Sequence, residues 1–145
     1  MGTRTSIRNT RIDIGRIQTR ARELSKSLLG GQFRAEVAAF IAVGEAPFWA
    51  RGIAKPLGIP ENKVAAELSR FAAGGLLIAL SGAEFDRRTL YERGPSSAQY
   101  WQAGYELVER AAADEALRLD IDCSTVLHAY LDVVHHETRR AGAEP

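Results

Sequence analysis

Residues 60–73 carry side chains that could read the base edges of a nucleic acid duplex. Val64, Leu68 and Phe71 recur at spacings of four and three, so a helix here would turn one apolar stripe inward. The other side of that helix would face outward with these side chains: Glu61, Asn62, Lys63, Ala66, Glu67 and Arg70. Amide groups bind adenine, and basic groups bind guanine or phosphate. The pattern therefore predicts recognition of duplex DNA.

A second group that could do chemistry lies near the C-terminus. His128, Asp132 and either His135 or His136 are four and then three or four residues apart, which on a helix brings them near one face. Imidazole and carboxylate groups bind divalent metals, and the thiol of Cys123 lies a few residues earlier. An ordinary solvated surface explains such clusters more often than a metal site does. We expect no metal here, and the metal hypothesis stays open as the alternative.

Catalytic chemistry is not indicated by the sequence. An enzyme would need a nucleophile with a base and an orienting group, or a glycine-rich phosphate loop, and neither pattern is visible. The pairs Gly30-Gly31 and Gly74-Gly75 fit the ends of helices. Cys123 is the single cysteine and cannot form an internal disulfide. We therefore expect no enzymatic activity and no cofactor.

The elements that would position residues 60–73 follow from hydrophobic periodicity. We predict a helix over 33–43 with Val37, Phe40 and Ile41 inward, and a helix from about residue 48 to Leu57. The turn Gly58-Ile59-Pro60 then leads into a helix from about Pro60 to Ala73, because proline suits the start of a helix.

A β-hairpin is expected to follow these helices. Residues 76–80 form a short apolar run, and Thr89-Leu90-Tyr91 predicts the return strand, so Arg87 and Arg88 would lie near the tip. The order helix, helix, turn, helix, strand, strand predicts a mainly α fold with a winged helix-turn-helix core and a two-stranded wing. In this arrangement the last helix can enter the major groove.

The stretch from about Arg34 to Tyr91 resembles the ArsR/MarR-like winged-helix regulators of bacteria. The resemblance is carried by Ile53-Ala54, Leu57-Gly58-Ile59, Val64 with Leu68, and Gly75-Leu76-Leu77. It implies a homodimer that binds operator DNA, with recognition helices in successive major grooves and Arg87 and Arg88 near the backbone or minor groove. Pro60, Ala65 and Ala66 depart from the polar residues usual there, so we expect phosphate contacts by Arg51, Lys55, Lys63 and Arg70 to supply much of the affinity.

Helices on either side of this core are expected to serve dimerisation. We divide the chain into a flexible basic arm over 1–11, with Arg4, Arg8 and Arg11, and one domain over 12–145. Within that domain, 12–31 is an N-terminal helix, 33–94 the winged helix-turn-helix and 96–140 two C-terminal helices, with a disordered tail after Arg140. The residues predicted to form the dimer contact are Ile17, Leu24, Leu28, Leu127, Tyr130, Leu131 and Val134.

Charge and composition fit this interpretation. The chain has 145 residues, 46% of them hydrophobic, and its net charge is +1. Residues 1–70 hold 12 Lys and Arg against 6 Asp and Glu, a net of +6, whereas residues 71–145 hold 7 against 12, a net of −5. Such a split favours a basic face toward a polyanion. No run is long enough to span a membrane, and we expect a cytoplasmic protein.

Two alternatives stay open. The aromatic side chains of Trp49, Tyr100, Trp101 and Tyr105 could line a small-ligand pocket, although core and dimer packing is the more frequent use of such residues. A protein-interaction module built on a winged-helix scaffold could use the acidic C-terminal half to bind a protein partner, with little sequence-specific DNA binding. The expected partners are otherwise double-stranded DNA and a second copy of the chain, with any effector unidentified.

Overall fold

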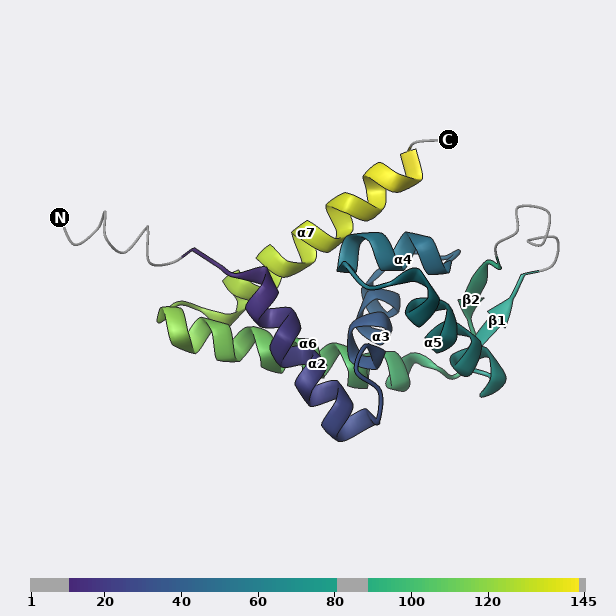
Figure 1. Ribbon diagram of the computed structural model, residues 1–145, viewed down its shortest axis with the longest axis horizontal. Coiled ribbons are helices and arrows are strands. Elements are labelled where there is room, and N and C mark those ends of the chain that lie inside the picture. Colours follow the sequence, from purple (N-terminus) through teal and green to yellow (C-terminus); the bar gives the residue numbers. More distant parts are fainter. Residues whose placement is uncertain (1–10, 81–88, 144–145) are drawn as a thin grey trace.

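The computed structural model describes the backbone of residues 11–80 and 89–143 and the side chains of these stretches as far as His135. The described elements follow one another along the chain in this order: α2 (Ile14–Leu29), α3 (Arg34–Val43), α4 (Ala50–Leu57), α5 (Glu61–Ala73), β1 (Leu77–Ala79), β2 (Tyr91–Arg93), α6 (Ala98–Leu119) and α7 (Cys123–Ala143). Figure 1 shows the long helix α6 crossing the molecule, with the wing near its start and the turn into α7 at its far end. The predicted mainly α winged helix-turn-helix is confirmed.

The three helices of the predicted core begin and end close to their expected positions. Val37, Phe40 and Ile41 of α3 and Ile53 and Leu57 of α4 are buried. α4 ends at Gly58, whose backbone is left-handed with a φ of 66°, a conformation that glycine adopts without steric cost. α5 follows after two more residues, so the turn between the helices is as short as the sequence predicts.

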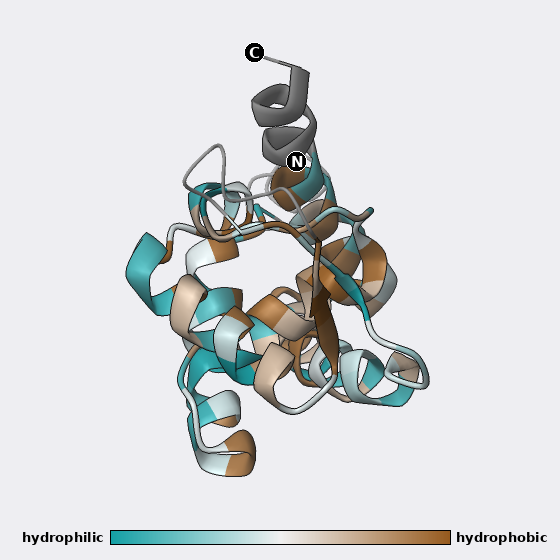
Figure 2. Cartoon of the chain, turned by 90° about the vertical axis from the view of Figure 1, so that its right-hand side faces the viewer, coloured by the Kyte–Doolittle hydropathy of each residue, from teal (hydrophilic) through white to brown (hydrophobic). Residues whose placement is uncertain are grey.

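The core lies where α3 crosses α6. Gly104 of α6 meets α3 so closely that a Cβ at this position would lie 2.4 Å from the Cβ of Ala38. Side chains from α2 through α7 join one buried cluster around this crossing, including Ile17, Val108 and Val126. Figure 2 shows apolar residues gathered where the elements meet, with hydrophilic residues on most outer turns.

The wing differs from its prediction in the position of the return strand. β1 and β2 pair antiparallel with Ala79 opposite Tyr91, so the return strand begins where it was expected to end. Phe48, just before α4, forms an isolated bridge to Tyr91 through two backbone hydrogen bonds of 2.8 Å, and this long-range pairing fixes the strand position. The residues between the strands, 81–88, lie outside the described chain, and with them Arg87 and Arg88.

The N-terminal helix buries one face against the rest of the chain and leaves its C-terminal leucine exposed. The buried positions of α2 are Ile17, Ala21 and Ser25, whereas Leu24 is half-buried and Leu28 is 63% exposed. Ser25 occupies the inner face because its hydroxyl donates to the carbonyl of Gly31 and accepts from the amide of Ala35. Ser25 therefore completes the buried face of α2, and Leu28 remains exposed.

The C-terminal helix is longer than predicted. α7 begins at Cys123, where the carbonyl of Asp122 accepts the amides of Thr125 and Val126, and it continues to Ala143. The tail expected to be disordered after Arg140 therefore starts as helix, because the residues there include good helix formers and no proline interrupts them. In the part of the chain that the structure describes, no helix is both long and apolar enough to cross a membrane.

Candidate nucleic-acid interface

The two faces of α5 are arranged as the sequence predicts. Its apolar stripe is fully buried, and the opposite face meets solvent. Five of the six side chains predicted to face outward are exposed: Glu61, Asn62, Lys63, Ala66 and Arg70. Two amides at the start of the helix, those of Lys63 and Val64, are taken up by the carbonyl of Pro60 at 3.0 and 3.2 Å. The burial of the apolar side of α5 thus fixes the direction in which its polar side faces.

Cationic side chains of both helices of the helix-turn-helix are exposed. Arg51 and Lys55 extend from α4, and Lys63 and Arg70 from α5. Among the residues that the structure describes, none of these four cations forms an ion pair with an acidic side chain. Unpaired cations keep their full attraction for a polyanion such as the phosphate backbone.

Glu67 does not belong to the outward face predicted for it. Its carboxylate is held by Arg34 of α3 through a forked contact, with Nε to Oε1 at 2.8 Å and Nη2 to Oε2 at 3.4 Å. Both side chains are largely covered, and the hydrogen bond to Glu67 raises the pKa of Arg34 above its ordinary value. Pairing with α3 removes this carboxylate from any contact with a ligand of α5.

The remaining DNA candidates fall mostly beyond the described chain. Arg87 and Arg88 lie within 81–88, and Arg4 and Arg8 lie within 1–10. Arg11 is described and exposed just before α2. The described part of the interface therefore consists of α4, α5 and the two strands at the base of the wing.

A solved structure of another protein shares this arrangement of helices and strands. A transcriptional regulator of the MarR family from Rhodococcus sp. RHA1 aligns with a TM-score of 0.52 and 15% identity, covering 71% of this chain and 73% of its own. The fold is that of a MarR-type winged-helix protein. The PcaV transcriptional regulator from Streptomyces coelicolor aligns over 88% of this chain and 93% of its own, with a TM-score of 0.48 and 17% identity. No family model and no curated protein matches the sequence.

Within the MarR-type fold, α4 and α5 are the helix-turn-helix and β1 with β2 is the wing. The helices α2, α6 and α7 lie outside that unit, as the sequence predicts. The resemblance expected from the stretch around Ile53 to Leu77 is thus confirmed at the level of the fold. At these identities the likeness concerns the fold alone.

The residues predicted for dimerisation separate into two groups. The first group packs in the core of the chain itself: Ile17, Leu127, Tyr130 and Val134. Their burial shows that they pack within their own chain, and a contact of these four residues with a partner stays a prediction. Leu24 and Leu131 are half-buried and Leu28 is exposed, and their role in a dimer stays a prediction.

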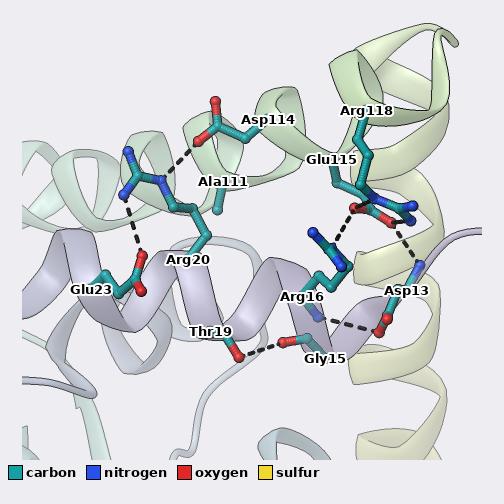
Figure 3. A pocket seen from close by; sticks show the side chains of 10 residues that line it. All are labelled: Asp13, Gly15, Arg16, Thr19, Arg20, Glu23, Ala111, Asp114, Glu115 and Arg118. Atoms are coloured by element: carbon teal, nitrogen blue, oxygen red, sulfur yellow. Dashed lines mark hydrogen bonds and ion pairs between the residues drawn. The ribbon is translucent and has the colours of Figure 1, made fainter.

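An open groove of about 810 Å³ runs between the first half of α2 and the last turns of α6 (Figure 3). Charged side chains of both signs line it. Arg20 donates to Asp114 at 2.8 Å, and Arg118 makes two hydrogen bonds of 2.8 Å to the buried carboxylate of Glu115. The Arg118 hydrogen bonds, helped by the amide of Asp13, lower the pKa of Glu115 despite its burial.

The histidine cluster and the aromatic group do not form sites in the described structure. His128 and Asp132 are exposed, whereas His135 is half-buried and stacks on Phe40 with ring centroids 5.6 Å apart. Among the described residues no group of three His, Cys, Asp or Glu could hold a metal, and the side chain of His136 is not described.

The aromatic side chains are divided between core and surface. Trp101 is buried, donates to Ser97 at 2.8 Å, and meets Phe71 and Tyr100 edge to face. These contacts are those of core packing, the use that the sequence favours for the aromatic residues. Trp49 lies apart from them, at the start of α4, where its ring covers Gly52.

One polar cluster was not found by sequence reasoning. Glu36 of α3 is buried and receives hydrogen bonds from Gln18 at 3.0 Å and Arg22 at 2.5 Å, both from α2. Desolvation raises the pKa of Glu36, and the contact with Arg22 opposes that shift. The signal was present in the sequence, because Glu36 is a lone charge inside the apolar run 35–43. Such a charge must find a partner when it is buried.

Proposed function

We propose that this chain is a DNA-binding transcriptional regulator that inserts α5 into the major groove of duplex DNA. The observation that carries the proposal is the exposed polar face of α5, together with the exposed, unpaired cations of α4 and α5. In a helix-turn-helix the second helix packs on the domain through its buried face, so its exposed face is free to enter the major groove. The MarR-type fold supports this use of the helix.

The composition of the face predicts how affinity and specificity are divided. Asn62 can pair with adenine and Arg70 with guanine. Ala65 and Ala66, in the middle of the exposed face, offer only methyl groups, which can contact thymine methyls. Few base contacts remain, so phosphate contacts by Arg51, Lys55 and Lys63 supply most of the affinity. Each neutralised phosphate steepens the salt dependence by about 0.9 in the logarithmic slope, so we expect strongly salt-dependent binding.

We further propose that the protein acts as a homodimer through the side of the molecule that bears α2 and the end of α6. The groove on this side is open, and a two-fold partner would place the same surface of a second copy against it. Leu117 of α6 is 83% exposed one turn from Asp114 at the edge of this groove. The groove and the wing lie at opposite ends of α6, so a dimer formed there leaves both copies of α5 available (Figure 1).

Selection of bound duplexes from a random DNA pool tests the proposal. We expect an enriched, roughly palindromic motif whose half-sites lie about one duplex turn apart, because a two-fold dimer presents two recognition helices. Absence of any enriched motif, together with weak salt-sensitive binding only, would overturn the regulator and favour a protein-interaction module.

A further inference from the structure

The last carbonyl of α4 is held by side chains from a different helix. The carbonyl groups in the last turn of an α-helix lack partners within the helix. The carbonyl of Ala54 accepts the amides of Gly58 and Ile59, whereas that of Leu57 accepts from Gln18 Nε2 at 2.8 Å and Arg22 Nη2 at 3.1 Å. Leu57 is the residue directly before the turn into α5. Two side chains of α2 therefore fix the start of that turn.

The same two side chains are themselves fixed by a buried carboxylate. Gln18 and Arg22 each donate to Glu36, whose side chain has no exposed surface. The guanidinium of Arg22 also lies over the ring of Phe33 at 5.1 Å. Because the buried carboxylate of Glu36 holds the Gln18 amide and the Arg22 guanidinium in place, the same two groups have little freedom to leave the carbonyl of Leu57, and the cluster links α2 stiffly to α4.

A second arginine ties the end of α2 to the recognition helix. Arg34 Nη1 donates to the carbonyl of Leu29 at 2.6 Å, while its other nitrogens hold Glu67 of α5. Both helices of the helix-turn-helix are thus joined to α2 by side chains that have few alternative partners. A shift of α2 would carry the turn and α5 with it or break these hydrogen bonds.

We propose that Gln18, Arg22 and Arg34 are positioning residues that set the placement of α5 through α2, so that displacement of α2 changes DNA affinity. The expected change in DNA affinity rests on the proposed function. The link between α2 and the turn before α5 can be measured without DNA. It identifies α2 as the element through which any effector or partner bound on the α2 and α6 side would act on DNA binding. Such coupling needs contacts that differ between two states of the protein, and these hydrogen bonds are the contacts that a shift of α2 would change.

Gln18→Ala is the test variant, because it removes both contacts without leaving a charge unpaired. Amide hydrogen exchange is measured on the full chain for the wild type, for Gln18→Ala and for the matched control Gln102→Ala, an exposed glutamine of α6. We expect exchange at Gly58, Ile59 and Lys63 to accelerate about three- to ten-fold, the factor that corresponds to loss of one hydrogen bond. Amides in the middle of α6 should exchange as in the wild type.

Affinity for the duplex selected from the random pool, or for a mixed-sequence duplex at low salt if none is selected, is measured in parallel. The inference expects Gln18→Ala to bind more weakly while remaining fully folded by circular dichroism, and Gln102→Ala to bind as the wild type does. Exchange that accelerates equally in every helix, or nowhere, would overturn the link. Selective acceleration without a change in DNA affinity would overturn the positioning role. A wild type that binds no duplex would refute the proposed function, and the exchange comparison would still decide the link.

Discussion

The carboxylate of Glu115 is buried, and neighbouring hydrogen-bond donors stabilise its charged form. Its contribution to the stability of the fold therefore depends on pH. The hydrogen bonds from Arg118 and the amide of Asp13 lower its pKa below the ordinary value of 4.5. A lowered pKa stabilises the folded state above the ordinary value, and this stabilisation is lost as the pH falls through the folded value. We therefore expect the free energy of unfolding of the wild type to fall on acidification below about pH 4.5.

Glu115→Gln should show a weaker dependence on pH in that window, because the titrating group is gone. At neutral pH we expect it to be less stable than the wild type by about 1–2 kcal/mol, since charge-assisted hydrogen bonds are replaced by neutral ones. Urea denaturation at a series of pH values measures both effects. Glu106→Gln, which changes an exposed carboxylate of the same helix, should follow the wild type. Parallel pH curves for wild type and Glu115→Gln would contradict the assignment.

Lys63 is an exposed, unpaired cation at the start of the recognition helix, and its predicted partner is a phosphate. Lys63→Ala should weaken binding to all duplexes by a similar factor and make the logarithmic salt slope shallower by about 1. Titrations at several salt concentrations give the slope. Lys26→Ala removes an exposed lysine of α2 and serves as the matched control, with no expected change. Loss of sequence preference with an unchanged slope would instead indicate a base contact.

Sequence reasoning about single residues succeeded where exposure follows from helical periodicity. The outward positions of Asn62, Lys63 and Arg70 required only the position of the buried stripe. It failed where a polar side chain meets a partner far along the chain, as for Glu67 with Arg34 or Ser25 with Ala35. Periodicity places a residue on a face of its helix, but it holds no information about which other helix covers that face.

At the scale of elements, the crossing of α3 and α6 depends on a glycine that sequence reasoning did not single out. Gly104 lies in the middle of α6, where glycine costs helix stability relative to alanine, so another gain must offset it. The gain is the close packing of α3 against α6 that the missing Cβ allows. An added methyl would overlap Ala38 and approach the carbonyl of Ala35 at 3.1 Å. The close approach of the two helices explains the residue.

Gly104→Ala should therefore destabilise the fold even though alanine is the better helix former. We expect the free energy of unfolding to fall by about 1–3 kcal/mol, the usual cost of overpacking a core. Chemical denaturation measures it. Gly104→Ala combined with Ala38→Gly should recover part of the loss, and Gln102→Ala on the exposed side of α6 should be neutral. A single variant more stable than the wild type would mean that the helices separate at little cost.

Local signals were enough to predict the helices and the presence of the wing, because glycine pairs and periodic stripes lie within single segments. The strand register was not predictable in the same way. β2 is fixed by Phe48, which lies more than forty residues earlier and pairs with Tyr91. A three-residue strand offers too little alternation to set its own register, so the contact made before α4 decides it.

At the scale of the whole molecule, the side formed by α2 and the end of α6 is the surface through which we propose that the dimer forms. Leu117 is 83% exposed one turn from Asp114 of the charged groove, and the end of α2 carries Leu28, also exposed. A dimer of this 15.9 kDa chain formed through this side would bury these apolar side chains across a two-fold axis.

We accordingly expect the wild type to sediment with about twice the mass of the chain and Leu117→Asp to shift toward the monomer, because a charge would be buried in the contact. Val43→Asp is the matched control: Val43 is 42% exposed at the end of α3, away from the groove, and its variant should remain dimeric. Circular dichroism establishes that both variants are folded.

If the proposed function also holds, Leu117→Asp should lose affinity for a two-half-site duplex far more than for a single half-site, since the second contact becomes intramolecular only in the dimer. Equal sedimentation of Leu117→Asp and the wild type would place the dimer contact elsewhere, and a wild type that stays monomeric at high concentration would remove the dimer from the proposal.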